Sequence, residues 1–242
     1  MWRLDCQCTY DLPEPRSATW SFSLKYIPLA FLLTLLNQTA LAATEEVWEL
    51  QRDRDGIQIY TRSVEGSKFK AVKAEMEIDA PIRELVGLVM DTDACPEWAA
   101  LCKDSEVVQQ TSETDLHVYT LNDVPWPVKD RDAVARVLWS QDEAGIVTMR
   151  AELVSGFVPE TKKAMRLTYG KTAWIFVPVG PDRTRVISEA HLDPGGATPA
   201  WVTNMLLVDS PFDTMAGMRT LVASGRYQDA QIEFLGSVSA AE

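Results

Sequence analysis

Histidine is the scarcest residue with catalytic potential in this sequence, since His117 and His191 are the only two in 242 residues. Each lies alone in a run typical of a β-strand, where few side chains meet the geometric demands on a catalytic base. The sequence also lacks the G-x-S-x-G, P-loop and H-E-x-x-H patterns. Glu189 and His191, two residues apart on one strand face, are the one acid–base pair that the spacing offers. We therefore predict no catalytic residue and no cofactor, and keep an enzyme acting through this pair as the alternative.

Positive charge is also in short supply, because 23 lysines and arginines face 35 aspartates and glutamates, a formal net charge of −12. Nucleic-acid phosphates would repel such a chain, and anionic lipid surfaces would not hold it steadily. The balance excludes a nucleic-acid partner and mainly favours solubility. With 46% hydrophobic and 24% charged residues, the composition is that of a globular protein. The length suits one domain or at most two, and we expect a monomer.

No apolar run near the N-terminus is long enough to cross a bilayer. The run from Ile27 to Leu36 is far shorter than the roughly 20 residues of a spanning helix. Lys25 precedes it, and the small residues Ala40 and Ala42 follow it. This order is typical of a secretory signal peptide, with cleavage expected after Ala42.

The signal defines the predicted domain organisation. Residues 1–42 form the signal-peptide region, and residues 43–242 form a single exported domain located in the periplasm of a Gram-negative-type cell. Residues 1–23 are mixed in charge and lack apolar periodicity, which indicates a mis-assigned start with the true initiator near Leu24.

Cysteine is rare as well, and only Cys95 and Cys102 remain after the predicted cleavage. An even pair in an oxidising compartment favours a disulfide. Seven helical steps would separate the two Cα atoms by about 10 Å, too far for a bridge, so the chain must bend near Pro96. Two reduced, buried cysteines are the alternative. Two thiols without a nearby histidine fall short of a zinc site, so we predict no metal.

Turn residues divide the chain after the signal into short elements. Asp55-Gly56 indicates a hairpin between two strands, and Asp79-Ala-Pro81 ends a third strand. A helix follows Pro81, because Leu85, Leu88 and Val89 form an apolar stripe. From residue 106 to residue 193 the predicted strands are SEVVQQ, LHVYTL, AVARVLW, IVTMRAEL, MRLTYGKTAWIFVPV and TRVISEAHL. Their succession predicts an antiparallel meander.

Asp193-Pro-Gly-Gly196 ends the sheet, and a long helix is predicted from Thr198 to about Ser224. Thr198 suits the N-cap and Pro199 the first turn. Pro211 predicts a kink, because proline removes a helical hydrogen bond. The coarse architecture is α+β, a strongly curved antiparallel sheet with a long C-terminal helix across it.

Four segments together resemble the START domain, a lipid-transfer module. They are DGIQIYTR, VPWPVKDRDAV, MRLTYGKTAW and LDPGGATPAWVTN, in family order within about residues 47–224. The resemblance implies a helix-grip fold, a curved antiparallel sheet wrapped around the C-terminal helix, with a hydrophobic cavity between them. It also implies a carrier that encloses one lipid or other hydrophobic molecule and contacts membranes transiently. Some helix-grip relatives are cyclases or hydrolases, and an interaction module with a closed cavity is a third alternative.

The candidate ligand-binding residues are large or flexible apolar side chains and one charge: Trp126, Arg136, Trp174, Trp201, Met205, Val208, Phe212 and Met215. The five from the last helix recur at spacings of three and four, which places them on one face, and we expect that helix to act as a lid. Arg136 is the candidate cavity charge, and a salt bridge at the strand edge is its alternative. Trp126, between two prolines, is expected near the cavity or its rim. The aromatic residues are equally suited to an ordinary core.

Overall fold

A single sheet dominates the computed structural model, which describes residues 47–196 and 198–236. The predicted signal peptide and its cleavage point lie outside the described residues. Nine strands follow the order β1-β2-β3-β10-β9-β7-β6-β5-β4, and β8 pairs with β6 off this path. The strands are β1 (Glu49–Arg54), β2 (Ile57–Arg62), β3 (Ala71–Ile78), β4 (Cys102–Ser112), β5 (Asp115–Asn122), β6 (Asp130–Gln141), β7 (Val147–Leu153), β8 (Ala164–Arg166), β9 (Gly170–Gly180) and β10 (Arg183–Leu192). Neighbours along the path pair antiparallel, whereas β8 is parallel to β6.

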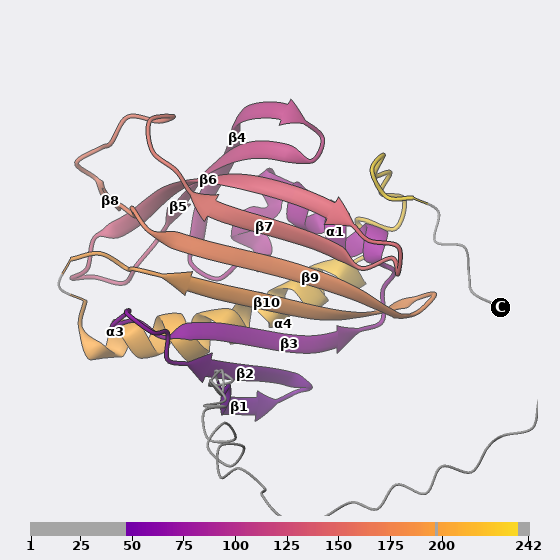
Figure 1. Ribbon diagram of the computed structural model, residues 1–242, viewed down its shortest axis with the longest axis horizontal. Coiled ribbons are helices and arrows are strands. Elements are labelled where there is room, and N and C mark those ends of the chain that lie inside the picture. The colour runs from indigo at the N-terminus through magenta and orange to yellow at the C-terminus, as the bar shows by residue number, and fades with distance from the viewer. Residues whose placement is uncertain (1–46, 197, 237–242) are drawn as a thin grey trace, which may run out of the picture. The chain divides into compact units, whose positions relative to one another are not determined.

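The helices cover one face of the sheet and leave the other face to the strands (Figure 1). They are α1 (Ile82–Met90), η2 (Thr92–Ala94), α2 (Cys95–Trp98), α3 (Ala200–Asn204), η3 (Met205–Asp209) and α4 (Ser210–Ala223). The segments α3, η3 and α4 are consecutive and form one long C-terminal helix across the sheet. In the part of the chain described, no helix is both long and apolar enough to cross a membrane. The expected α+β helix-grip architecture is confirmed.

The C-terminal helix differs from its prediction at two points. It begins at Ala200 rather than after a Thr198 cap, and the Thr198 hydroxyl instead donates to the Gly195 carbonyl at 3.0 Å. Residues Met205–Asp209 form a π-helical turn directly before Pro211. Proline lacks an N–H and its ring clashes with the carbonyl four residues earlier, so the wider turn relieves the crowding that a regular helix would suffer.

One predicted strand is two in the structure. The run from Met165 to Val179 is divided into β8 and β9, because β8 leaves the meander to pair with the start of β6. The backbone N–H of Leu167 donates to the Asp132 carbonyl at 2.8 Å and extends this pairing. Asp193-Pro-Gly-Gly196 ends β10 as predicted, and Gly195 and Gly196 adopt φ of +69° and +62°, which suits glycine.

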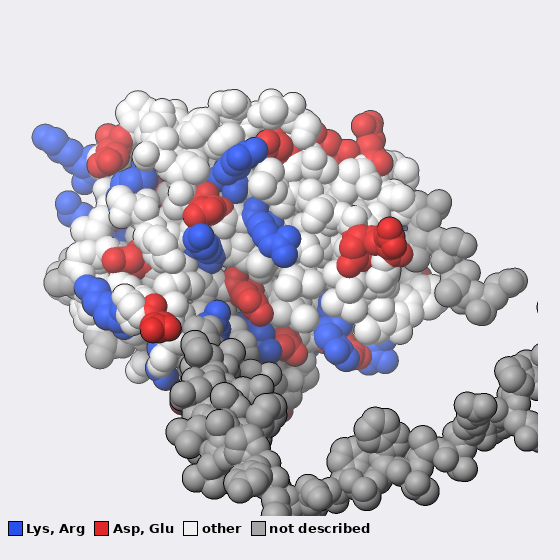
Figure 2. All heavy atoms as spheres, in the orientation of Figure 1, with Lys and Arg blue, Asp and Glu red and all other residues white. Residues whose placement is uncertain are grey.

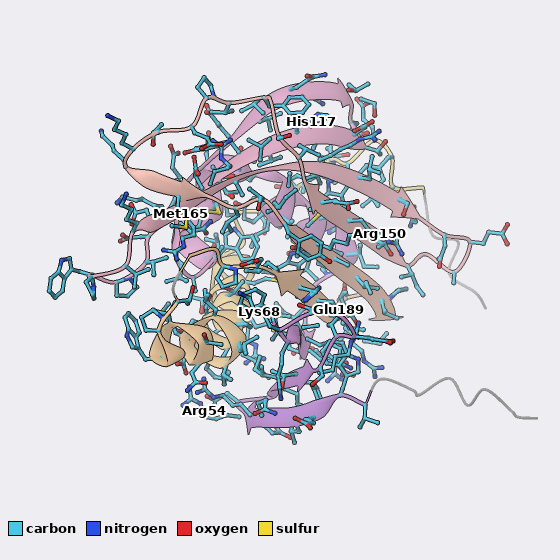
Figure 3. All side chains as sticks on the ribbon, turned by 60° about the vertical axis from the view of Figure 1, so that its left-hand side comes forward. Arg54, Lys68, His117, Arg150, Met165 and Glu189 are labelled. Carbon is cyan, nitrogen blue, oxygen red and sulfur yellow. A yellow bond between two sulfur atoms is a disulfide. The ribbon has the colours of Figure 1, made fainter. Side chains whose placement is uncertain are left out.

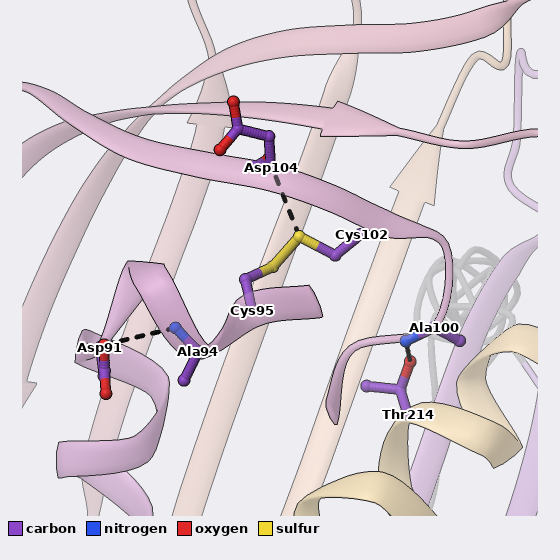
Figure 4. The surroundings of a disulfide bond; sticks show 7 residues. All are labelled: Asp91, Ala94, Cys95, Ala100, Cys102, Asp104 and Thr214. Carbon is purple, nitrogen blue, oxygen red and sulfur yellow. Dashed lines mark hydrogen bonds between the residues drawn. A yellow bond between two sulfur atoms is a disulfide. The ribbon is translucent and has the colours of Figure 1, made fainter. Parts of the chain in front are cut away.

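The predicted disulfide is present between Cys95 and Cys102, with Cα atoms 5.9 Å apart. The chain bends between them, because α2 ends at Trp98 and β4 begins at Cys102. Figure 4 shows that the chain between the two cysteines reaches α4, where the backbone N–H of Ala100 donates to the Thr214 hydroxyl at 3.0 Å. The bridged segment thereby joins the C-terminal helix to the first strand of the meander.

Aromatic side chains and methionines fill the core between the sheet and α4. The ring of Phe176 stacks with those of Trp174 and Trp139, with ring centroids 6.3 and 6.4 Å apart. Met215 and Met218 of α4 are fully buried against this layer. The core thus extends beneath α4, and the cavity described next lies beneath α3, η3 and the first half of α4.

Candidate functional site: a cavity under the C-terminal helix

A cavity of about 580 Å³ lies between the sheet and the C-terminal helix. This volume is within the range of roughly 300–1,000 Å³ that is usual for sites enclosing a small ligand. The sheet contributes Val72 and Ala74 from β3, Trp174 from β9, and Ser188 and Ala190 from β10. The helix contributes Thr203, Leu206, Leu207, Pro211, Thr214 and Met215. An interior of this size can hold a ligand, unlike the closed cavity of the third alternative.

Alternation along β10 separates the cavity from the predicted acid–base pair. Ser188 and Ala190 line the cavity, whereas Glu189 and His191 lie on the opposite face of the sheet. His191 Nε2 lies 3.0 Å from the Ser67 hydroxyl, and no hydrogen bond joins it to Glu189 within the described residues. Figure 3 shows Glu189 away from the C-terminal helix. This pair therefore does not face a molecule held in the cavity.

The predicted cavity charge, Arg136, is also on the opposite face. Its guanidinium donates to both carboxylate oxygens of Asp115, at 2.9 and 2.7 Å, and its side chain is 49% exposed. These hydrogen bonds hold the pKa of Asp115 below its ordinary value. The salt-bridge alternative was right, because side chains alternate along β6 and the cavity face carries the odd-numbered residues, Val137 and Trp139 among them.

Arg131, five residues earlier, is the charged residue of β6 that lines the cavity. The residue is 7% exposed. Its Nε donates to the Pro194 carbonyl at 3.0 Å and its Nη2 to the Gly195 carbonyl at 3.3 Å, while Nη1 donates to the Lys129 carbonyl. Arg131 thus joins the start of β6 to the turn after β10. Burial lowers the pKa of Arg131, although a guanidinium stays charged at neutral pH.

The other face of β6 holds a buried ion pair that the sequence did not reveal. Arg166 of β8 donates to both carboxylate oxygens of Asp132, at 3.1 and 2.9 Å, and the two side chains are 8% and 2% exposed. Arg166 also donates to the Val158 carbonyl at 3.0 Å. The segment that leads into β8 therefore covers this part of the outer face, and the pair fastens it there.

The predicted ligand-binding stripe of the C-terminal helix is broken by the π-helical turn. Val208 and Met215 lie in the cavity wall, but Trp201 is 45% exposed and Met205 is not part of the wall. Phe212 is buried outside the cavity, where the guanidiniums of β1 cover its ring. A π turn contains more residues than an α turn, so positions before and after it no longer share a face.

Trp126, expected near the cavity or its rim, is 90% exposed and is not part of the cavity wall. The backbone N–H of Val128 donates to the Pro125 carbonyl at 3.2 Å, so Trp126 occupies the corner of a tight turn. Val124, just before this turn, is buried and lines the cavity instead. Trp174, by contrast, lies in the cavity wall where it was expected.

Two lysines of the cavity wall, Lys68 and Lys70, were also missed by the sequence analysis. They belong to the connection between β2 and β3, which has no periodic pattern that would assign a face. The sequence could have indicated Arg131. It lies on the same face of β6 as Trp139, the largest apolar residue of that strand, and this face is the one expected to point inward. No group of histidine, cysteine, aspartate and glutamate side chains within residues 47–196 and 198–236 is arranged to hold a metal ion.

Comparison with known proteins agrees with this geometry. The START domain family model matches residues 33–229. The chain belongs to the START domain family. START domains bind lipids or other hydrophobic ligands and are generally not enzymes, although some family members are cyclases.

Bacterial and human START proteins resemble the chain over most of its length. An uncharacterized protein of Pseudomonas aeruginosa is 31% identical over 195 residues, covering 77% of this chain and 96% of that protein. The crystal structure of a STAR-related lipid transfer protein from Xanthomonas axonopodis is 31% identical with a TM-score of 0.67, covering 73% of this chain and 98% of that one. Human StAR-related lipid transfer protein 5 shares the fold at 19% identity and a TM-score of 0.69, covering 76% and 89% of the two chains.

Proposed function

We propose that this START protein is a carrier that encloses a single lipid or other hydrophobic molecule in the cavity under its C-terminal helix. The observation that carries the proposal is the wall itself, in which aliphatic and aromatic side chains from β3, β9 and the helix surround about 580 Å³. Apolar surface facing an open interior is costly in water, and a hydrophobic ligand removes that cost. The wall comes from one chain, which supports a carrier that works as a monomer.

The carrier is proposed to work in the periplasm and to touch membranes transiently. The Cys95–Cys102 bridge supports an oxidising compartment, because disulfides are rare where thiols are kept reduced. Trp126 and Trp201, 90% and 45% exposed, support the membrane contact. Both lie at the end of the sheet where β6 begins and β10 ends, and tryptophan is favoured at the interface between water and lipid. Cell fractionation tests the location directly.

Native mass spectrometry of the protein purified from its own cells tests the carrier. We expect a fraction of the protein to carry one extra mass, which organic solvent extracts as a lipid or another apolar compound. A protein that carries no such mass, and takes up no fluorescent lipid from vesicles, would contradict the proposal.

Two adjacent residues of β10 provide a matched control for the cavity. Ala190 points into the cavity and Glu189 points to the other face. Ala190→Trp fills the cavity and is expected to abolish the bound mass. Glu189→Trp adds the same side chain one residue away and is expected to leave the bound mass unchanged. Equal loss in both variants would show that the bound molecule is elsewhere.

A further inference from the structure

The charged residues of the cavity wall are all cations. Lys68, Lys70 and Arg131 line the cavity, and no aspartate or glutamate among the described residues does so. The chain as a whole has 35 acidic and 23 basic residues, so this wall reverses the balance of the chain. Figure 2 shows the contrast, since acidic and basic side chains are intermixed on the strand face of the molecule.

The three cations lie at one end of the sheet. Val72 of β3 pairs with Ala190 of β10, so Lys70, two residues earlier, lies toward the end where β10 stops. Arg131 lies at the same end, because it donates to the Pro194 carbonyl just beyond β10. Figure 3 shows Lys68 beside the C-terminal helix. The cavity therefore has a cationic end, and its other sheet residues are uncharged, with Trp174 and Ala74 among the apolar ones.

These cations differ in how far the protein neutralises them. Lys70 forms an ion pair with Glu49 at 3.1 Å. Lys68 is exposed and its ammonium contacts the Phe69 ring at 4.9 Å, with no carboxylate of the described residues in ion-pair range. Arg131 is buried and donates to three backbone carbonyls, again with no described carboxylate as partner. Two positive charges at the cavity thus lack a counter-ion from the described residues.

A buried cation without a counter-ion is costly, and an anion placed beside it recovers part of that cost. Arginine has five N–H donors in a fixed fork that matches carboxylate and phosphate oxygens, and three carbonyls leave part of this fork unused. A cavity lined by charge of one sign also concentrates ligands of the opposite sign at its mouth. A neutral lipid could accept hydrogen bonds from these groups but would bring no negative charge to balance them.

We propose that the cavity selects an amphipathic anion, with a carboxylate or phosphate group held at the end formed by Lys68 and Arg131 and its apolar body against Trp174 and the C-terminal helix. The proposal rests on the carrier function and specifies the chemical class of the ligand. Lys68 at the exposed mouth attracts the head group, and Arg131 receives it inside.

Displacement of Nile red, a neutral fluorescent probe of apolar sites, tests the selection on the full protein. Dodecanoate, dodecyl phosphate, dodecanol and dodecylammonium share one tail and differ in head group. We expect at least one anion to displace the probe at about a tenfold lower concentration than dodecanol, a difference of about 1.4 kcal/mol, and dodecylammonium to be weakest. The two anions distinguish a carboxylate from a phosphate as the preferred head group.

Charge reversal at the mouth assigns the preference to these residues. Lys68→Glu is expected to weaken binding of the preferred anion by about fivefold or more, because an attractive charge becomes a repulsive one, and to leave dodecanol unchanged. Lys162→Glu is the matched control, since Lys162 is exposed and outside the cavity wall. Arg131→Gln should remove the anion preference as well, with its melting temperature recorded because it also loses bonds to the turn. If Arg131→Gln does not fold, the comparison of Lys68→Glu with Lys162→Glu tests the anion preference by itself.

The results separate the two proposals. Loss of Nile red binding in Ala190→Trp would uphold the carrier. If dodecanol and both anions then displace the probe equally well from the unmodified protein, the anion selection is overturned. Equal effects of Lys68→Glu and Lys162→Glu would also overturn it. No binding of Nile red or of any of the four compounds would overturn the carrier and the selection together.

Discussion

Gly217 of α4 lies so close to Trp98 of α2 that a Cβ atom added at residue 217 would sit 2.3 Å from the Trp98 carbonyl oxygen. The Cα and carbonyl carbon of Trp98 would be 3.0 Å away. This approach is between two backbones, so no side chain can rotate to make room. The second half of the C-terminal helix is therefore fixed to the bridged segment, where Thr214 also accepts a hydrogen bond from Ala100.

Gly217→Ala is predicted to destabilise the protein although it improves helix propensity. Alanine in place of glycine favours a helix by about 1 kcal/mol, whereas overpacking costs about 1–3 kcal/mol and here meets an immovable backbone. We expect a net loss of about 1–2 kcal/mol in the free energy of unfolding, measured by urea denaturation. Gly180→Ala is the control, because its added Cβ would meet only Arg183 at 3.8 Å. A stabilised Gly217→Ala variant would show that the contact is looser than the structure has it.

Reduction of the Cys95–Cys102 bridge is predicted to lower stability by about 2–3 kcal/mol, because the closed loop is short on the chain-entropy scale. The unfolded, unreduced protein should expose neither of these two thiols to a labelling reagent. The double variant Cys95→Ala/Cys102→Ala is expected to have the stability of the reduced protein and to be insensitive to reductant. Recovery of both thiols without reduction would refute the bridge.

Local patterns in the sequence predicted most elements but not which side their residues face. The Asp193-Pro-Gly-Gly196 turn and the bend between Cys95 and Cys102 follow from short-range rules, because glycine, proline and disulfide geometry act over a few residues. These rules hold whatever the rest of the chain does. The resemblance of the four motifs then gave the fold and the cavity.

Contacts distant in sequence decided the rest. Asp132 is buried on the outer face of β6 only because Arg166 and the segment before it cover that face. The periodicity of β6 alone cannot predict this contact, because Arg166 is 34 residues away in the sequence. Arg131 and Arg136 lie on opposite faces of β6, and the sequence pattern favoured the face that carries Arg136. Arg136 was therefore predicted as the cavity charge in place of Arg131. The prediction of a single apolar face on the C-terminal helix failed for a similar reason. Spacings of three and four place residues on one face only in an unbroken α-helix, and the π-helical turn interrupts it.

The buried pair of Asp132 and Arg166 gives a sharp stability test. Asp132→Asn is predicted to cost about 3–5 kcal/mol, because it leaves the Arg166 guanidinium buried without its carboxylate. Asp115→Asn breaks the exposed pair with Arg136 on the same sheet face and should cost far less, because solvent screens an exposed pair. Urea denaturation of both variants measures the difference. Similar costs would mean that the Asp132–Arg166 pair is solvated.

Trp126→Ala is predicted to leave stability unchanged to within about 0.5 kcal/mol, since the side chain is 90% exposed. If Trp126 contacts membranes, transfer of a fluorescent fatty acid from phosphatidylcholine vesicles should become severalfold slower, while binding of the same molecule from water is unchanged. Val179→Ala, at the far end of β9 and 42% exposed, is the control for loss of an apolar surface residue. An unchanged transfer rate would exclude Trp126 from the contact.

The structure narrows the predicted lid to α3 and η3, because α4 is fixed to α2 at Gly217. Arg52 of β1 holds η3 to the edge of the sheet through an ion pair with Asp209 at 2.7 Å. The pair is partly exposed, with side chains 28% and 53% accessible, so it is worth about 1 kcal/mol at most, which corresponds to about fivefold in an opening equilibrium.

Arg52→Met is therefore predicted to speed the exchange of a fluorescent lipid by up to about fivefold, with little change in the free energy of unfolding. Lys171→Met is the matched control, because it removes an ion pair with Glu152 that joins β9 to β7 and does not involve the C-terminal helix. In Arg52→Cys/Asp209→Cys, made in a chain with Cys6 and Cys8 replaced by serine, a bifunctional maleimide joins η3 to β1, and Cys95 and Cys102 do not react because they are bridged. Exchange should then slow well below that of the unlinked variant. A linked protein that exchanges lipid as fast as the unlinked one would show that the ligand enters elsewhere, and the helix would then be a fixed wall.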